Sequence, residues 1–253
     1  MPPRAQRSPA RRLVAPAIAT LIVFAILCSL GAWQWRRLHW KEVLIAQVAE
    51  RTVQPPVAAP GPEAWPGLDL AAFDYTPVTV SGIFLNDKEA HLYGQLSDPR
   101  GPQGGVGWWI YAPLQTDAGW IVYVNRGFVP DGKQAAATRA EGQIAGRVTV
   151  NGLARRPETP WHLSGDGISA NDQWFAREPS LFAKAAGFPA AEVAPYSIDA
   201  DATPNPGGLP QGGETVFVFP NNHLQYVVTW FGLAFALLGV FAVYARGVLR
   251  GKS

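Results

Sequence analysis

The sequence predicts a membrane protein in which two transmembrane α-helices, one near each end of the chain, bracket one mostly antiparallel β domain of the α+β class. Residues 13–33 and 225–245 carry no charged side chain, and each stretch is long enough to cross a bilayer core as a helix. The region between them is rich in Pro, Gly, Val and Trp, which is typical of strands joined by turns. This region of about 190 residues is long enough for one domain with a hydrophobic core of its own.

The first span follows a basic tail, residues 1–12, that contains four arginines. A cleaved signal peptide also begins with a basic region and an apolar run. The apolar run 13–33 is long for a signal peptide, and the Trp- and Arg-rich segment after it makes a poor cleavage site. We therefore expect an uncleaved transmembrane helix whose outer end is anchored at the membrane interface.

The second span fixes the expected orientation. Its C-terminal tail, residues 246–253, contains Arg246, Arg250 and Lys252, whereas no Lys or Arg lies between Lys184 and Arg246. Positive charge favours the cytoplasmic side of a span. With two spans, both termini are therefore expected in the cytoplasm, and the central domain, residues 34–224, is expected outside it.

The central domain is expected to begin with a helical extension of the first span and a stiff linker. Leu38, Ile45 and Val48 recur with helical spacing in residues 34–52. Five prolines then make residues 53–68 an extended segment.

Alternating apolar residues predict the strands that follow, and Asp117-Ala118-Gly119 reads as a hairpin turn between two of them. Two short helices are expected at residues 134–141 and 180–186, the second with Gly187 as its C-terminal cap. The expected strands are 76–84, 90–96, 110–114, 121–129, 147–153 and 215–219.

Composition excludes several classes of function. The net charge of only +2 gives no sign of the strongly basic surface that nucleic-acid-binding domains carry. The single cysteine, Cys28, lies in the first span, so the domain has no disulfide, zinc cluster or CxxC pair. Met1 is the only methionine, and the lack of soft sulfur ligands argues against copper delivery.

No enzyme constellation is visible either. The P-loop, the HExxH motif and the GxSxG elbow are all absent. His91 and His162 stand alone. The carboxylate pairs Asp69 with Asp74 and Asp166 with Asp172 lie beside turns and read better as solvated loop residues. We therefore expect a protein that is not an enzyme.

The strongest chemical signal lies at the membrane boundary. His223, Tyr226, Val227 and Trp230 share one helix face, and a neutral imidazole beside a flat indole can ligate haem iron. Arg36 and Arg37, just outside the first span, could pair the haem propionates. His39 lies next to them as a possible second ligand. The alternative is an ordinary interfacial belt of aromatic and basic residues, which spacing alone favours.

Five segments, in order along the chain, together resemble the Surfeit locus protein 1 family, assembly factors for haem–copper cytochrome oxidases. They read LGAWQWRRLHWK from Leu30, Tyr75 to Phe84, VYVNRGFVP from Val122, NDQWF from Asn171, and NNHLQY with TWFG from Asn222.

The resemblance implies a bacterial inner-membrane protein with a periplasmic domain that binds haem a and helps deliver it to the oxidase catalytic subunit. It carries over His223 as the candidate haem ligand, whereas His39 departs from the family pattern. The haem a synthesis enzymes and membrane lipid are further expected partners. Asn125, Arg126 and Gly127 read as structural residues, with a buried arginine that pairs with strand-end carbonyls.

Two main hypotheses remain open on the sequence. In the first, the protein binds haem a at the outer face of the membrane. In the second, it is a cofactor-free scaffold that holds an oxidase assembly intermediate, and His223 is only an interfacial anchor. A third class, an enzyme, would require a catalytic pair that the sequence does not show.

Overall fold

The computed structural model describes residues 9–158, 173–215 and 221–250. The chain divides into two compact units, which are Met1–Gln47 with Val218–Ser253, and Val48–Phe217. Each unit is described by itself below.

The first unit is a pair of long helices. α1 spans Pro9–Thr52 and α4 spans His223–Leu249. Both are long and apolar enough to cross a membrane. Pro16 lies inside α1 without ending it, and the helix continues through residues 34–52 as the spacing predicts.

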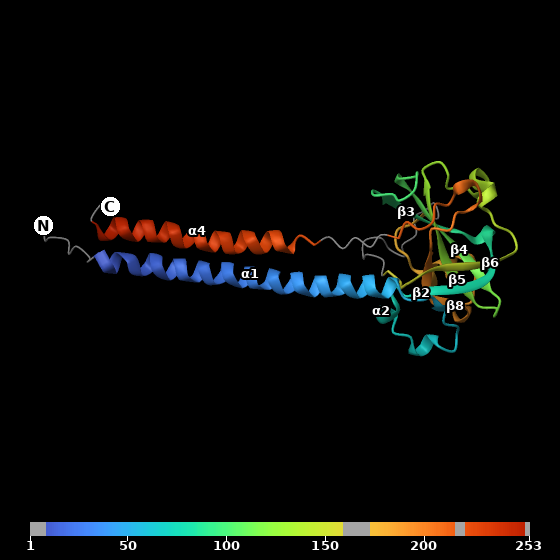
Figure 1. Ribbon diagram of the computed structural model, residues 1–253, viewed down its shortest axis with the longest axis horizontal. Helices are drawn as coiled ribbons and strands as arrows, with labels where there is room; N and C mark the ends of the chain where they lie inside the picture. The colour runs from blue at the N-terminus through green and yellow to red at the C-terminus, as the bar shows by residue number, and fades with distance from the viewer. Residues whose placement is uncertain (1–8, 159–172, 216–220, 251–253) are drawn as a thin grey trace. The chain divides into compact units, whose positions relative to one another are not determined.

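The two helices pack side by side in opposite directions (Figure 1). Gln34 of α1 is bonded to His223, whereas Gly31, one turn earlier, lies against Phe231, two turns later in α4. From the first contact to the second, the residue number falls in α1 and rises in α4. The two helices are therefore antiparallel. The two helix ends nearest the chain termini therefore lie at the same end of this unit.

The second unit contains a closed β barrel. Five strands form a ring of hydrogen-bonded neighbours in the order β2–β6–β8–β5–β4, and β4 pairs back to β2. Closure leaves these strands no open edge, so their backbone groups find partners within the ring. The five are β2 (Pro77–Phe84), β4 (Gly105–Thr116), β5 (Ile121–Pro130), β6 (Arg147–Arg155) and β8 (Val193–Ala200).

Three more strands extend the ring. β3 (Ala90–Leu96) is antiparallel to β4, and β7 (Gln173–Trp174) is parallel to β3. β1 (Val57–Ala58) is parallel to β2. Short helices occupy the connections: η1 (Trp65–Gly67), α2 (Leu70–Phe73), η2 (Asn86–Lys88), η3 (Ala136–Gly142), α3 (Pro179–Ala186), η4 (Ala190–Glu192) and η5 (Pro206–Gly208).

Apolar side chains fill the barrel and a second cluster beside it. Val78, Val122 and Ile198 are fully buried in the first cluster. In the second, the buried ring of Phe182 in α3 meets the rings of Tyr111, Tyr123 and Trp174. Burial of such large rings stabilises the domain strongly and holds α3 against the sheet.

Most expected strands are confirmed, and most neighbouring strands pair antiparallel as expected, but the sheet is mixed because the pairs β1–β2, β3–β7 and β5–β8 are parallel. β8 was not expected from the sequence, since Pro195 interrupts its pattern. The helix expected at 134–141 is instead a 3-10 segment with non-helical backbone at Arg139. The strand expected at 215–219 lies outside the described residues except for Thr215, which is not in a strand.

The segment expected as a stiff linker forms part of the domain. Trp65 packs edge-on against Trp120, and both Trp65 Nε1 and the Tyr196 hydroxyl donate hydrogen bonds to the carbonyl of Pro60. Residues of this segment therefore cover the barrel core rather than only spanning a distance.

Candidate functional site

The first candidate site lies between the two helices, at the first residue of α4. His223 Nδ1 is 2.7 Å from Oε1 of Gln34. An amide oxygen only accepts hydrogen bonds, so Nδ1 carries a proton in this arrangement, and in the neutral imidazole Nε2 then keeps its lone pair. No other group among the described residues bonds to the imidazole. The site therefore presents an oriented nitrogen ligand.

The residues that were expected on one helix face with His223 differ in how deeply they are buried. Val227 is buried and Trp230 is partly buried, whereas Tyr226 is 51% exposed. One turn along the pair, a Cβ built on Gly31 would lie only 2.9 Å from the ring of Phe231. The helices therefore approach closely beside His223, and Tyr226 lies off the packed seam.

The expected basic residues take two different positions. Arg36 lines an open hollow of about 600 Å³ together with Ser29, Ala32, Trp35 and Phe231. The guanidinium of Arg37 lies 4.1 Å above the ring of Trp40, a cation–π contact. Neither arginine has a carboxylate partner within the described part of the chain. Arg36 is therefore the cation that lines the hollow, while Arg37 is held by its own helix.

His39 takes part in other contacts. Its Nδ1 lies 3.1 Å from Glu42, and its ring meets Trp35 edge-on. Among the described residues, no contact joins His39 to His223. The structure therefore does not bring the two histidines together as a ligand pair.

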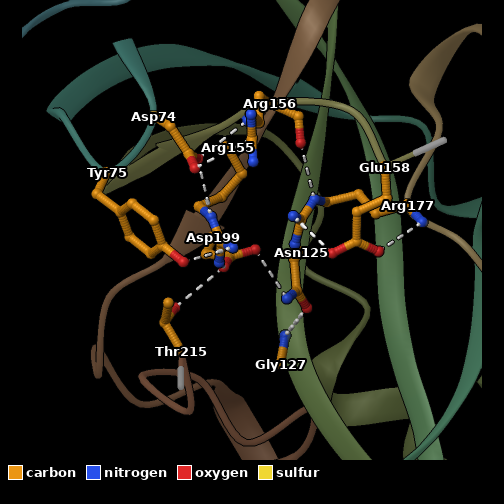
Figure 2. Close-up of polar contacts among 10 residues, drawn as sticks. All are labelled: Asp74, Tyr75, Asn125, Gly127, Arg155, Arg156, Glu158, Arg177, Asp199 and Thr215. Carbon is orange, nitrogen blue, oxygen red and sulfur yellow. Dashed lines mark hydrogen bonds and ion pairs between the residues drawn. The ribbon is translucent and has the colours of Figure 1, made fainter. Parts of the chain in front are cut away.

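A second polar cluster lies in the barrel domain, around Asp199 (Figure 2). The Asp199 carboxylate accepts hydrogen bonds from Asn125 Nδ2 at 3.0 Å and from Arg155 Nη1 at 2.5 Å. Thr215 Oγ1 donates a third at 3.2 Å. Asn125 Oδ1 in turn accepts from the backbone N–H of Gly127. The conspicuous Asn-Arg-Gly segment is thus tied to β8 through a buried carboxylate.

Gly127 is required here by its backbone. Its φ of +124° is a conformation that side chains disfavour. A Cβ at this position would also lie 2.0 Å from the carbonyl oxygen of Gln211. Arg126 donates to the carbonyl of Gly142 at 2.6 Å. Gly127 therefore has the backbone role that the structural interpretation gave it, and Arg126 is buried and bonded to a carbonyl as expected.

Arg177 completes the cluster on its other side. It is bonded to Glu158 and to the carbonyl of Arg156 (Figure 2). Burial raises the pKa of the neighbouring Tyr111 hydroxyl far above its usual value, so this group stays protonated. A cavity of about 260 Å³ lies among these side chains. Because its charged groups are already partnered, the cluster is built for stability rather than for proton transfer.

The other candidate carboxylates and histidines have structural contacts or lie outside the described residues. Asp69 caps α2 by accepting from two backbone N–H groups, and Asp74 pairs with Arg155 and Arg156. His91 is bonded to Glu89. His162, Asp166 and Asp172 fall in residues 159–172, which the structure does not describe. Within the described ranges, no cluster of three or more His, Cys, Asp or Glu could hold a metal ion.

Comparison with known proteins identifies the family of this chain. The model of the SURF1 family matches residues 21–235. The chain belongs to the SURF1 family. It is 34% identical over 227 residues to Surfeit locus protein 1 of Homo sapiens, covering 85% of this chain and 73% of that one. It is 33% identical over 240 residues to a SURF1-like protein of Monosiga brevicollis, covering 90% and 87%.

Family membership confirms the resemblance found in the sequence. The matched range includes Gln34, Arg36 and His223, as well as every strand of the barrel domain. Sequence reasoning missed Gln34. The signal that could have found it is its spacing with Gly31 and Leu38, since all three are buried on one face of α1.

Proposed function

We propose that this SURF1-family chain is an assembly factor for a haem–copper cytochrome c oxidase. It binds haem a at the outer membrane interface and helps to insert it into the catalytic subunit. In this proposal the chain resides in a bacterial inner membrane, with both termini in the cytoplasm and the barrel domain in the periplasm. The proposal is supported by the family, by two apolar helices, and by the histidine between them.

The observation that carries the proposal is the hydrogen bond between Gln34 and His223. Histidine ligands of metals usually donate their second N–H to an acceptor, which fixes the tautomer and the ring orientation. Gln34 supplies that acceptor at 2.7 Å. Nε2 of His223 is then the nitrogen that would bind the iron of the cargo haem.

The surroundings fit a haem with a long isoprenoid tail. Arg36 lines the open hollow beside Phe231, and a guanidinium with no carboxylate partner in the described part of the chain suits a propionate. The exposed apolar helix surfaces would keep the tail in lipid. A single histidine ligand also suits delivery, because a cargo held by one protein ligand is easier to release than one held by two.

Co-expression with the enzymes of haem a synthesis tests the proposal. The chain would be purified in detergent, its optical spectrum recorded, and its extracted haem analysed. Wild type should retain haem a, and His223→Ala should lose it. His39→Ala is the matched control, because it removes an exposed histidine of the same helix pair and should leave haem retention unchanged.

Gln34 gives a finer test of the same site. Gln34→Leu removes the acceptor for Nδ1 and should weaken haem retention by about 10- to 100-fold. Gln34→Glu keeps an acceptor and should preserve most of it. Haem that stays bound in His223→Ala would move the site elsewhere, with Arg36, Arg37 and His39 tested next.

The cofactor-free scaffold makes the opposite prediction. Under that hypothesis, purified wild type carries no haem a, His223→Ala supports oxidase assembly as well as wild type does, and the chain co-purifies with the oxidase catalytic subunit. An oxidase assay in cells that carry each variant separates the two. Conversion of haem o or haem a by the purified chain would instead indicate an enzyme.

A further inference from the structure

Arg126 is a buried cation whose bonds are incomplete. Its side chain is 2% exposed. Nη2 donates to the carbonyl of Gly142 at 2.6 Å and to Oδ1 of Asn205 at 2.8 Å, and the ring of Phe84 covers one face of the guanidinium. Nη1 is buried and has no hydrogen-bond partner among the residues that the structure describes.

The other buried arginines of this domain differ from Arg126. Arg139 is paired with Glu89, Arg155 with Asp199, and Arg177 with Glu158. Within the described residues, Arg126 forms no ion pair with any carboxylate. An unpaired buried charge is costly, and burial lowers the pKa of Arg126 to about 10.

Arg126 lines a cavity of about 290 Å³ between β6, the end of β8 and the loop after it. Phe84, Ile144, Val148 and Val150 give the cavity apolar walls. Among the described residues that line it, Asp201 is the only carboxylate, and its Oδ1 accepts from the N–H of Thr203. The cavity therefore combines an apolar wall with a buried cation that forms no ion pair among the described residues.

We propose that this cavity is a binding site for a small organic monocarboxylate with an apolar body, whose carboxylate completes the bonds of Arg126. Guanidinium is the side chain best suited to carboxylate. A phosphate dianion fits less well, because the lining offers one cation and Asp201 repels a second negative charge. The proposal is independent of haem binding, since every residue that it uses lies in the barrel domain.

Benzoate is the probe, and benzyl alcohol is its neutral counterpart. The full chain in detergent would be unfolded by heat at increasing concentrations of each compound, since a ligand that binds only the folded state raises the unfolding temperature. Benzoate should raise it in a saturable manner, and benzyl alcohol should not. An equal effect of both compounds, or no effect of benzoate, overturns the proposal.

Two variants sharpen the test. Arg126→Gln should abolish the benzoate effect. If that variant does not fold, Asp201→Asn decides, because it retains Oδ1 as the acceptor for Thr203 while it removes the like charge. Asp201→Asn should bind benzoate about threefold more tightly than wild type. Unchanged or weaker binding in Asp201→Asn contradicts the proposed site.

Discussion

The Asp199 cluster of the barrel domain and the helix pair differ in how completely their polar side chains are hydrogen-bonded. In the barrel, Asp199 is buried and bonded to Asn125, Arg155 and Thr215. In the helix pair, His223 is bonded through one nitrogen only, as far as the described residues are concerned. Arg36, which lines the hollow on α1, has no carboxylate partner among the described residues. Polar groups whose hydrogen bonds are all made within the protein stabilise the fold. An oriented group that still lacks a partner can bind a ligand.

The largest expected effect tests whether the Asp199 cluster is structural. Asp199→Ala leaves Arg155 buried without this carboxylate and removes the acceptor for Asn125 (Figure 2). Loss of one partner of a buried ion pair costs about 3–5 kcal/mol of unfolding free energy. Urea unfolding of the purified chain, followed by tryptophan fluorescence, measures it.

Asp117→Asn is the control for that variant. Asp117 pairs with Arg147, but both side chains are half or more exposed, so the free energy of unfolding should not change measurably. If Asp199→Ala were as harmless as Asp117→Asn, the cluster would not be structural and its cavity would become a candidate site.

The next effect concerns Glu89 and the pH dependence of stability. Burial alone raises the pKa of Glu89, but hydrogen bonds with His91 and Arg139 outweigh it and lower the pKa to about 2. The group releases its proton more readily when folded than when unfolded. Its contribution, on the order of 3 kcal/mol, is therefore present above about pH 4.5 and is lost as the pH falls towards 2.

Glu89→Gln should remove this contribution. The variant should be less stable than wild type at pH 7, and the difference should shrink as the pH falls from about 4.5 to 2. Unfolding measured at several pH values checks the trend. A constant difference at all pH values would show that the ionisation of Glu89 is not the cause.

The smallest effect tests how closely the helices pack. Gly31→Leu places a side chain where a Cβ already lies 2.9 Å from the ring of Phe231. Such overpacking costs about 1–3 kcal/mol and should loosen the seam. The rate at which N-ethylmaleimide labels Cys28, the only cysteine, should rise several-fold in detergent.

Gly31→Ala is the milder companion of that variant, because the edge of the Phe231 ring has only a small distance to move. It should label at a rate between wild type and Gly31→Leu. Equal labelling of all three would show that Gly31 does not set the approach of the helices.

The sequence predicted the elements whose signals are local. Hydropathy over residues 13–33 and 225–245 predicted two long helices, and alternation predicted β2, β3 and β5 close to their observed ends. The Asp-Ala-Gly turn at residues 117–119 lies between β4 and β5 as expected, and Gly119 has a φ of +91°. Such signals depend only on residues a few positions apart, so they can be recognised in the sequence alone.

Membership of the family could also be recognised from the sequence, and so could the position of His223 at the start of the second long helix. Both depend only on the identity and order of residues. The partner of His223 could not. Gln34 lies 189 residues away, and only the antiparallel packing of α1 and α4 places its amide against the imidazole.

Tertiary structure alone decided that the sheet closes and where its charges meet. β8 contains Pro195 and gives a weak strand signal, yet it joins β5 and β6 and thereby completes the ring. In the sequence, nothing distinguishes Asp199 of this strand from the other acidic residues. In the barrel it forms an ion pair with Arg155 and accepts a hydrogen bond from Asn125. Spacing along a chain sets the face of each side chain. Long-range pairing sets which faces meet, and that depends on the free energy of the whole fold.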